Sequence, residues 1–268
     1  MAITTLAGAI AGEQQPVVYI KNETSAFNGS WTDFWTDAVN AGTNVTANAN
    51  GSTYDSTSAQ VAGQVYHVNP PSGNCYIATI KTRSGPTGSF NTSSALFVDR
   101  LWQGGTYPAT TTASQAIVTP TFPARDINGS TNGDGVVLCM VQVTTFTAAT
   151  TVTVTYTNES GTGSRTATAT MENVGQKAVT FFGLQSGDTG VRSVESVAVS
   201  AAQAAGTYIL IAVRPLAIII PDVGRKTICE DAITLGMPKL HNGSVPFVLY
   251  RGQAANLRMV TAYVETVG

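Results

Sequence analysis

The sequence predicts an all-β protein: an antiparallel β-sandwich of the jelly-roll or immunoglobulin-like kind, with a short N-terminal helix and an extended N-terminal arm. Two observations support this fold class. After the first 60 residues, short β-branched and aromatic runs recur about every 8–12 residues between Gly, Pro, Asn and Asp turns. In the threonine hairpin, residues 151–171, apolar and hydroxyl side chains alternate with the period of two typical of half-buried strands.

We divide the chain into residues 1–60, residues 61–221, which hold the sandwich core, and residues 222–268, a Pro/Gly-rich crossover with closing strands of the same domain. Glycine-containing loops are expected at 132–135 and 187–190. The expected strands are 16–20, 64–68, 75–82, 95–102, 136–143, 151–157, 165–171, 178–184, 194–201, 207–220, 246–250 and 257–267.

The N-terminal part is expected to hold an arm, one helix and a loop. Residues 1–15 are rich in Ala and Gly without periodicity, so we expect an extended arm that reaches a neighbouring subunit. A helix is predicted from Ser30 to Gly42, because Ser30 or Thr32 suits its N-cap and Gly42 can end it. Residues 43–60 contain mostly Asn, Thr, Ser and Ala, which favours a long loop.

The threonine hairpin should turn one apolar row toward the core and one hydroxyl row outward. Because threonine fits a pleated strand well, the hydroxyl row requires no special function. If the protein assembles, part of that row or the NESGTGS turn should be protected by a neighbour. The inner row is expected to contain Val152, Val154, Tyr156, Ala167, Ala169 and Met171.

Charge is scarce in this chain. Asp, Glu, Lys and Arg make up 11% of the residues, against about 25% in ordinary soluble domains. We infer that other protein covers much of the surface; the alternative is a monomer solvated by its hydroxyl groups. The net charge of -2 offers no basic field for nucleic acid. No signal peptide or membrane span is expected either.

The three cysteines are predicted to be buried free thiols, which fits assembly in a reducing cytoplasm. They are Cys75, Cys139 and Cys229, and an odd number cannot pair fully within one chain. The Asn-X-Ser/Thr triplets are interpreted as chance products of a composition rich in those residues, rather than as glycosylation sites.

Candidates for catalysis are few. His67 and His241 occur without HxH, HExxH or CxxC spacing, so neither a metal site nor a Cys/His nucleophile is predicted. Asp33 and Asp37 could form a glycosidase pair, but acids at a helix start are usually solvated. No phosphate-binding glycine loop is present. We therefore expect neither an enzyme nor a cofactor.

Asp99 and Arg100 are adjacent in a strand and should point to opposite faces. We interpret them as separately paired structural charges. The tryptophans could stack sugars in a lectin-like site, but such residues more often anchor a core or an interface.

Short motifs follow one another along residues 30–268: SWTDFW, YHVNPPSGNCYIATI, LFVDRLWQGG, the threonine hairpin, GLQSGDTGVRSVESVAVS and AVRPLAIIIP. In this order they resemble a family of tailed-bacteriophage virion structural proteins, the capsid-associated minor head or decoration proteins. The loop at 43–60 departs from that pattern. The resemblance implies a shared fold and assigns a structural role, in the fold or at an interface, to Trp31, Trp35, Asp99, Arg100, Trp102, Asp188, Arg192, Arg214 and Pro215.

The resemblance leads to the hypothesis of a capsid decoration or cement protein that binds the major capsid protein and itself, as a homotrimer. It would sit on the capsid surface of the virion after assembly in the host bacterial cytoplasm, without contacting nucleic acid or membrane. Two alternatives remain: a neck or tail component, such as a tail-tube or head-completion protein, and a glycan-binding receptor module of a tail spike.

Overall fold

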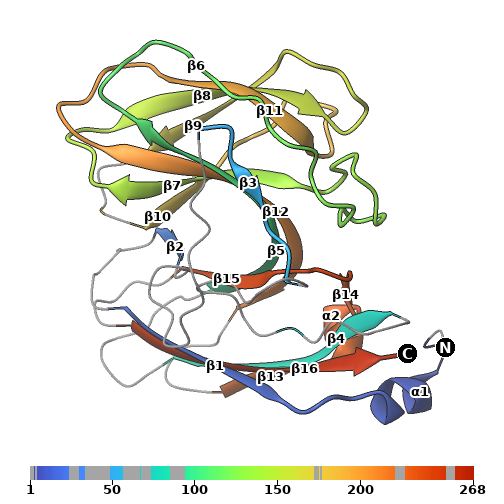
Figure 1. Ribbon diagram of the computed structural model, residues 1–268. Coiled ribbons are helices and arrows are strands. Elements are labelled where there is room, and N and C mark those ends of the chain that lie inside the picture. The colour runs from blue at the N-terminus through green and yellow to red at the C-terminus, as the bar shows by residue number, and fades with distance from the viewer. Residues whose placement is uncertain are drawn as a thin grey trace.

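The computed structural model confirms the all-β, antiparallel, sandwich-like fold (Figure 1). It describes residues 3, 5–23, 30–33, 49–56, 67, 74–84, 94–171, 175, 177–220, 227–251 and 257–268. In this part of the chain every strand pair is antiparallel. Neither described helix is long and apolar enough to cross a membrane.

A seven-stranded sheet forms the middle of the molecule. Its first strand, β12, also pairs with β5, so that all of its strands except β3 close into a barrel. Closure leaves these strands without a free edge along the paired stretch. In spatial order the strands are β12 (Thr207–Ile219), β7 (Val137–Thr144), β10 (Ala178–Phe181), β2 (Trp31–Asp33), β15 (Pro246–Arg251), β5 (Ser94–Pro108) and β3 (Ser52–Thr53).

Two further sheets flank the barrel, one at the top of Figure 1 and one at the bottom. The upper, four-stranded sheet consists of β6 (Gln115–Ala116), β11 (Val191–Val199), β8 (Thr150–Asn158) and β9 (Arg165–Met171). The lower, five-stranded sheet consists of β1 (Val17–Glu23), β16 (Leu257–Val267), β4 (Cys75–Ser84), β13 (Thr227–Glu230) and β14 (Lys239–Leu240). The helices α1 (Leu6–Ala11) and α2 (Ala232–Leu235) lie at the lower end, near both chain termini.

The apolar core is arranged in three layers, and strand alternation explains the division. On β12, Ile209 and Ile211 point into the barrel, whereas Tyr208 and Leu210 point toward the upper sheet. Farther along the same strand, Ile219 joins the core between the barrel and the lower sheet. The long strands β5 and β12 therefore contribute to all three layers and connect the two flanking sheets through the barrel.

The predicted N-terminal helix is wrong in position. Trp31–Asp33 is the strand β2, which pairs with β10 and β15, and residues 34–42 lie outside the described part of the chain. Tertiary pairing inside the barrel overrides the capping pattern that suggested a helix. The short N-terminal helix is instead α1, where the Thr5 hydroxyl accepts a hydrogen bond from the Gly8 N–H.

Two other expectations for the N-terminal part differ from the structure in detail. The segment after Thr5 packs on the end of β16 instead of extending away: Ala9 is buried, and the Thr266 hydroxyl donates to its carbonyl. Within the loop expected at 43–60, the structure describes residues 49–56; there Ser52 and Thr53 form the short strand β3, and Tyr54 is fully buried in the barrel, donating to Gln103 at 2.7 Å. The strand expected at 64–68 lies outside the described residues except for His67.

The threonine hairpin is confirmed. β8 and β9 pair from Thr150↔Met171 to Tyr156↔Arg165, and the predicted inner row is buried throughout. Outward-facing threonines are paired across the strands, as at Thr153↔Thr168. Gly133 and Gly187 have positive φ angles in the loops that were expected to tolerate them.

Candidate functional site

Asp99 belongs to a buried charged cluster outside the barrel. Its carboxylate lies 3.5 Å from both Arg125 and Arg214, and it accepts hydrogen bonds of 2.8 Å from the Ser244 hydroxyl and the Val245 N–H. Two arginines and two neutral donors thus hold one anion, which ties β5 to β12 and to the start of β15. Burial lowers the pKa of Arg214, opposed by its contact with Asp99.

Arg100 points the other way, into the barrel. Its guanidinium pairs with Asp33 of β2 and lies 4.7 Å from the ring centroid of Phe247 and 5.6 Å from that of Tyr54. The separate pairing expected for Asp99 and Arg100 is confirmed. Because the Asp33 carboxylate is fully buried against Arg100, it is not a solvated acid at a helix start; Asp37 lies outside the described residues.

The tryptophan residues do not form a sugar-stacking platform in the described part of the chain. Trp102 is fully buried, donates from Nε1 to the Asn50 carbonyl at 3.1 Å and packs against Phe122. Trp31 packs edge-to-face with Phe181 at 5.8 Å. Trp35 lies outside the described residues. The glycan-binding alternative therefore loses Trp102 as a stacking surface, since a sugar cannot reach it.

Asp188 fastens the hairpin to the loop before β11. It accepts from Arg165 through both Nε (3.0 Å) and Nη2 (2.9 Å), and also from the Tyr156 hydroxyl and the Asn158 amide. Arg165 foremost, followed by the neutral donors, lowers the pKa of Asp188 to about 2. Because Arg165 donates through two nitrogen atoms, this ion pair fixes the orientation of both side chains.

The remaining motif residues also have structural positions. Arg192 is exposed on β11. Pro215 lies in β12 opposite Val98 of β5, beyond Val213, the last residue that pairs with β7. Arg214 also donates to the Lys239 carbonyl at 2.8 Å. Most of the motif residues therefore hold strands together instead of lining one common site.

A different region has the features of an interaction site, and it begins with α2. The Asp231 carboxylate accepts from the N–H groups of Ile233 and Thr234, and Gly236 ends the helix in the left-handed conformation. These bonds, chiefly that from the Thr234 N–H, lower the pKa of Asp231. The capped turn exposes Ile233, whose accessible fraction of 79% is unusually high for isoleucine.

Helix α1 also turns its large apolar side chains outward. Leu6 and Ile10 are four residues apart, so they share one helix face, and they are 61% and 58% exposed. Only the small Ala9 is buried against the sheet. A helix that packs on its own domain normally does so through its larger apolar residues; here those residues face solvent.

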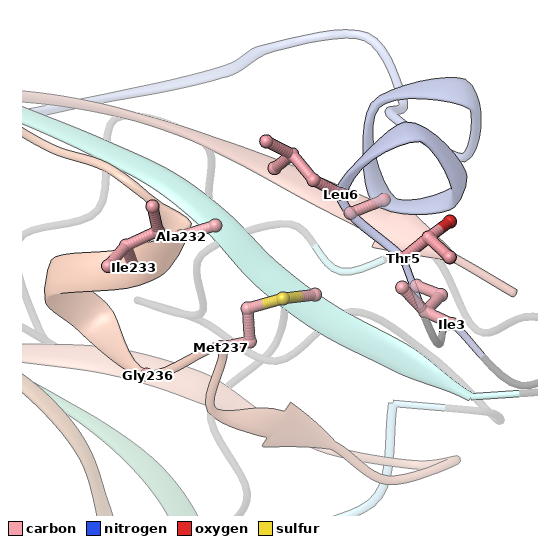
Figure 2. Close-up of a pocket in the computed structure, with 8 residues that line it drawn as sticks. Ile3, Thr5, Leu6, Ala232, Ile233, Gly236 and Met237 are labelled. Atoms are coloured by element: carbon pink, nitrogen blue, oxygen red, sulfur yellow. The ribbon is translucent and has the colours of Figure 1, made fainter.

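A groove with a volume of about 440 Å³ separates the two helices (Figure 2). The side chains of Ile3, Leu6, Ile233 and Met237 face it from opposite sides. A second groove of about 390 Å³ follows the other flank of α2. It is lined by Ala217, Ile218, Ile220, Glu230, Thr234 and Leu235.

We call this region the α1–α2 surface and define it by its exposed residues Leu6, Ile10, Ile218, Ile220 and Ile233. Among the residues that the structure describes, Glu230 is the one charged residue that lines either groove. Contiguous exposed apolar surface marks sites of protein interaction. This surface was not predicted from the sequence, although Asp231 and Gly236 bracket α2 in the usual capping pattern.

A second feature missed from sequence is a buried cluster of His67, Cys75 and Glu265. Burial foremost, and then the Glu265 carboxylate, raises the pKa of the Cys75 thiol. A catalytic thiol requires a lowered pKa, so Cys75 is not an activated nucleophile. All three cysteines are free; Cys75 and Cys139 are buried as predicted, but Cys229 is exposed, because β13 forms the outer edge of the lower sheet.

Comparisons with known proteins identify no family for the chain. No protein-family model matches it, and no curated protein matches it. Among solved structures, the infectious bursal disease virus Gt strain shows 9% identity and a TM-score of 0.23, with 96% of this chain and 81% of that chain covered. The infectious bursal disease virus VP2 subviral particle shows 8% identity and a TM-score of 0.23 over the same shares. Likeness this low carries no argument about function.

Proposed function

We propose that the protein is a bacteriophage virion structural protein, a capsid decoration or cement protein that binds the major capsid protein. The observation that carries the proposal is the α1–α2 surface, where a capped helix displays Ile233 between two apolar grooves. The order of the sequence motifs supports the phage setting, and the low charge supports a surface covered by other protein.

The mechanism is additional binding energy for the assembled shell. Each large aliphatic side chain that becomes fully buried contributes about 1.5–3 kcal/mol. If the receiving surface exists only where neighbouring capsid subunits meet, this energy stabilises the assembled lattice and not its free subunits. Several copies in one homotrimer would strengthen the attachment further, because a second contact forms at high effective concentration.

The first experiment counts copies per virion, by gel densitometry against the major capsid protein. A decoration protein on the capsid surface is expected in hundreds of copies, as the number of lattice sites requires. About a dozen copies would overturn this role in favour of a neck or tail component. Binding of purified protein to host glycans, without binding to shells, would favour the tail-spike module.

The second experiment locates the attachment surface by adding purified protein back to shells that lack it. Ile233→Asp should reduce co-sedimentation with the shells by about 100-fold, because a charge replaces a buried aliphatic group. The matched control is Val118→Asp, which changes another side chain of high exposure, 74%, far from the two helices. Equal binding by the two variants would remove the α1–α2 surface from the proposal.

A further inference from the structure

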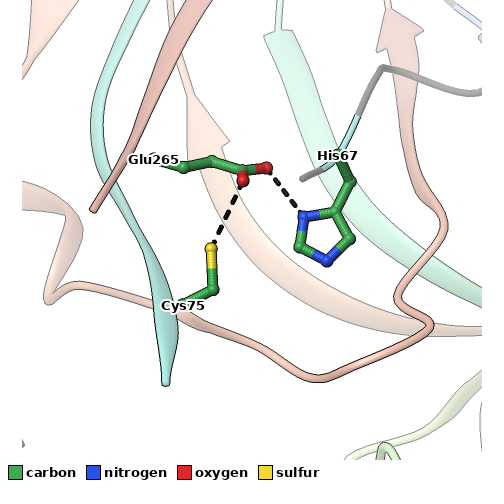
Figure 3. Close-up of side chains that lie close together, drawn as sticks. All are labelled: His67, Cys75 and Glu265. Atoms are coloured by element: carbon green, nitrogen blue, oxygen red, sulfur yellow. Dashed lines mark hydrogen bonds and ion pairs between the residues drawn. The ribbon is translucent and has the colours of Figure 1, made fainter. Parts of the chain in front are cut away.

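Three side chains of kinds that can bind metal ions meet in a buried cluster (Figure 3). Cys75 begins β4, Glu265 lies near the end of β16, and His67 precedes β4 in the chain. Their ligand atoms, the thiol sulfur, a carboxylate oxygen and a ring nitrogen, all lie within 4.8 Å of one another. Segments far apart in the sequence thus converge on one point.

A β-bulge places Cys75 in this cluster. The pairing of β16 with β4 shifts after Val264, so that β4 carries one extra residue between Ile77 and Thr79. As a result Cys75 and Ile80, five positions apart, face the same core, whereas a regular strand would put them on opposite faces. Bulges commonly re-aim a side chain beside a functional site.

Glu265 is the centre of the contacts. His67 Nδ1 lies 2.8 Å from one carboxylate oxygen, which also accepts from the Tyr263 hydroxyl at 3.1 Å. The Cys75 thiol donates to the other oxygen at 3.3 Å. The His67 Nε2 atom is buried and has no hydrogen-bond partner among the residues that the structure describes. The His67 ring nitrogen and the Cys75 sulfur therefore both point at the same carboxylate.

We propose that His67, Cys75 and Glu265 form a structural site for a divalent transition metal, with Zn²⁺ as the best-fitting ion. Zn²⁺ binds thiolate, imidazole and carboxylate at about 2.0–2.3 Å, which in a tetrahedron separates the ligand atoms by about 3.3–3.8 Å. Side-chain rotations that move the ligand atoms by about 1 Å would produce this arrangement. With three protein ligands, the fourth position of the tetrahedron would be completed by water.

The charges balance in this site. Binding replaces the thiol proton of Cys75, which passes to solvent, and the thiolate and carboxylate then neutralise the dication. This matters because a buried site with net charge would be strongly unfavourable. The bound ion would tie β4 and β16 to His67. This site is independent of the proposed attachment to a capsid.

The test begins with the full chain carrying Cys229→Ser, so that the exposed thiol cannot bind metal. After dialysis against Zn²⁺ and removal of excess, mass spectrometry of metals should find about one Zn²⁺ per chain. Replacement by Co²⁺ should give a thiolate-to-cobalt charge-transfer band and tetrahedral absorption. The Tm should fall on removal of the ion by a chelator. Protein without stoichiometric metal, or with a cobalt spectrum lacking the thiolate band, would overturn the proposal.

Two variants assign the ligands. Cys75→Ser keeps a hydrogen-bond donor for Glu265 but removes the thiolate, and Glu265→Gln keeps the shape but removes the charge. Each should weaken Zn²⁺ binding by at least about 100-fold, the upper end of what loss of an outer-shell partner costs. Circular dichroism verifies that each variant is folded. A folded Cys75→Ser protein that binds Zn²⁺ as tightly as its parent would show that the cluster is only a hydrogen-bond network.

Discussion

The outer face of the β8–β9 hairpin and the α1–α2 surface both carry little charge, yet they differ in chemistry. On the hairpin, threonines such as Thr153 and Thr168 present hydroxyl groups that water can satisfy. On the α1–α2 surface, Leu6 and Ile233 present hydrocarbon that water cannot. A low charged fraction therefore has two meanings. The hydroxyl face of the hairpin can stay in water or accept a neighbouring protein. The hydrocarbon of the α1–α2 surface gains free energy when a neighbouring protein covers it.

The largest expected effect is in the protection of the two surfaces within the particle. Ile233→Cys and Thr168→Cys, each made with Cys229→Ser, should both react quickly with a thiol reagent in the free protein, because both positions are exposed. In the assembled particle the rate at position 233 should fall by at least about tenfold, and the rate at position 168 by less. Labelling followed by mass spectrometry measures both rates.

This labelling experiment also decides the meaning of the hydroxyl row. Some protection at position 168 means that a neighbouring copy covers the hairpin, as the sequence predicts. An unchanged rate there means that its low charge reflects composition alone. Stronger protection at 168 than at 233 would reverse the comparison.

The next effect separates the inner and outer rows of the hairpin. Val154→Ala should lower the free energy of unfolding by about 2 kcal/mol, because it removes two methyl groups from a fully buried position. Thr155→Ala, one residue further, should cost less than about 1 kcal/mol, since it loses only the cross-strand contacts with Thr166 and Ser196 on the outer face. Urea unfolding monitored by tryptophan fluorescence measures the difference. Equal costs would contradict the assigned faces.

The third prediction concerns the acid sensitivity of the hairpin end. The pKa of Asp188 falls from 3.8 to about 2 in the folded protein, so its stabilisation is fully present above pH 3.8 and is lost as the pH falls toward 2. Asp188→Asn should therefore unfold more readily near neutral pH and lose less stability over that acidic interval. Thermal melts from pH 5 to about 2 provide the measurement. If the Tm of the two proteins falls in parallel with pH, the assigned role of the Arg165–Asp188 ion pair is contradicted.

The smallest effect is expected at the α2 cap. Asp231→Ala should weaken attachment to shells by about fivefold, because the turn that displays Ile233 loses its N-cap. Asp231→Asn is the matched control, since asparagine caps equally well without the charge. Loss of attachment in both variants would assign the effect to the carboxylate charge instead of to the cap, and the apolar nature of this surface would need revision.

Repeating local patterns made much of the fold predictable. The Val/Thr alternation of residues 151–171 indicates a hairpin and even its buried row. The adjacency of Asp99 and Arg100 indicates opposite faces and hence separate partners. These inferences need only the period of a strand.

Features that depend on distant partners were not predictable in the same way. Trp31–Asp33 becomes a strand only because β10 and β15 are there to pair with it. The closure of the barrel depends on β12 meeting β5. The cluster at Glu265 needs a bulge in β4 that nothing local in the sequence announces. In each case tertiary contact, and not local propensity, determines the conformation.

The pairing of β1 with β16 delays completion of the lower sheet during synthesis of the chain. Val17–Glu23 are synthesised long before their hydrogen-bonding partners, Leu257–Val267. At a synthesis rate of about 5–20 residues per second, the early strand waits roughly 10–50 s for its partner. Helix α1 cannot dock before then either, since it packs on the end of β16. The α1–α2 surface, as the structure shows it, therefore forms only after β16 has been synthesised.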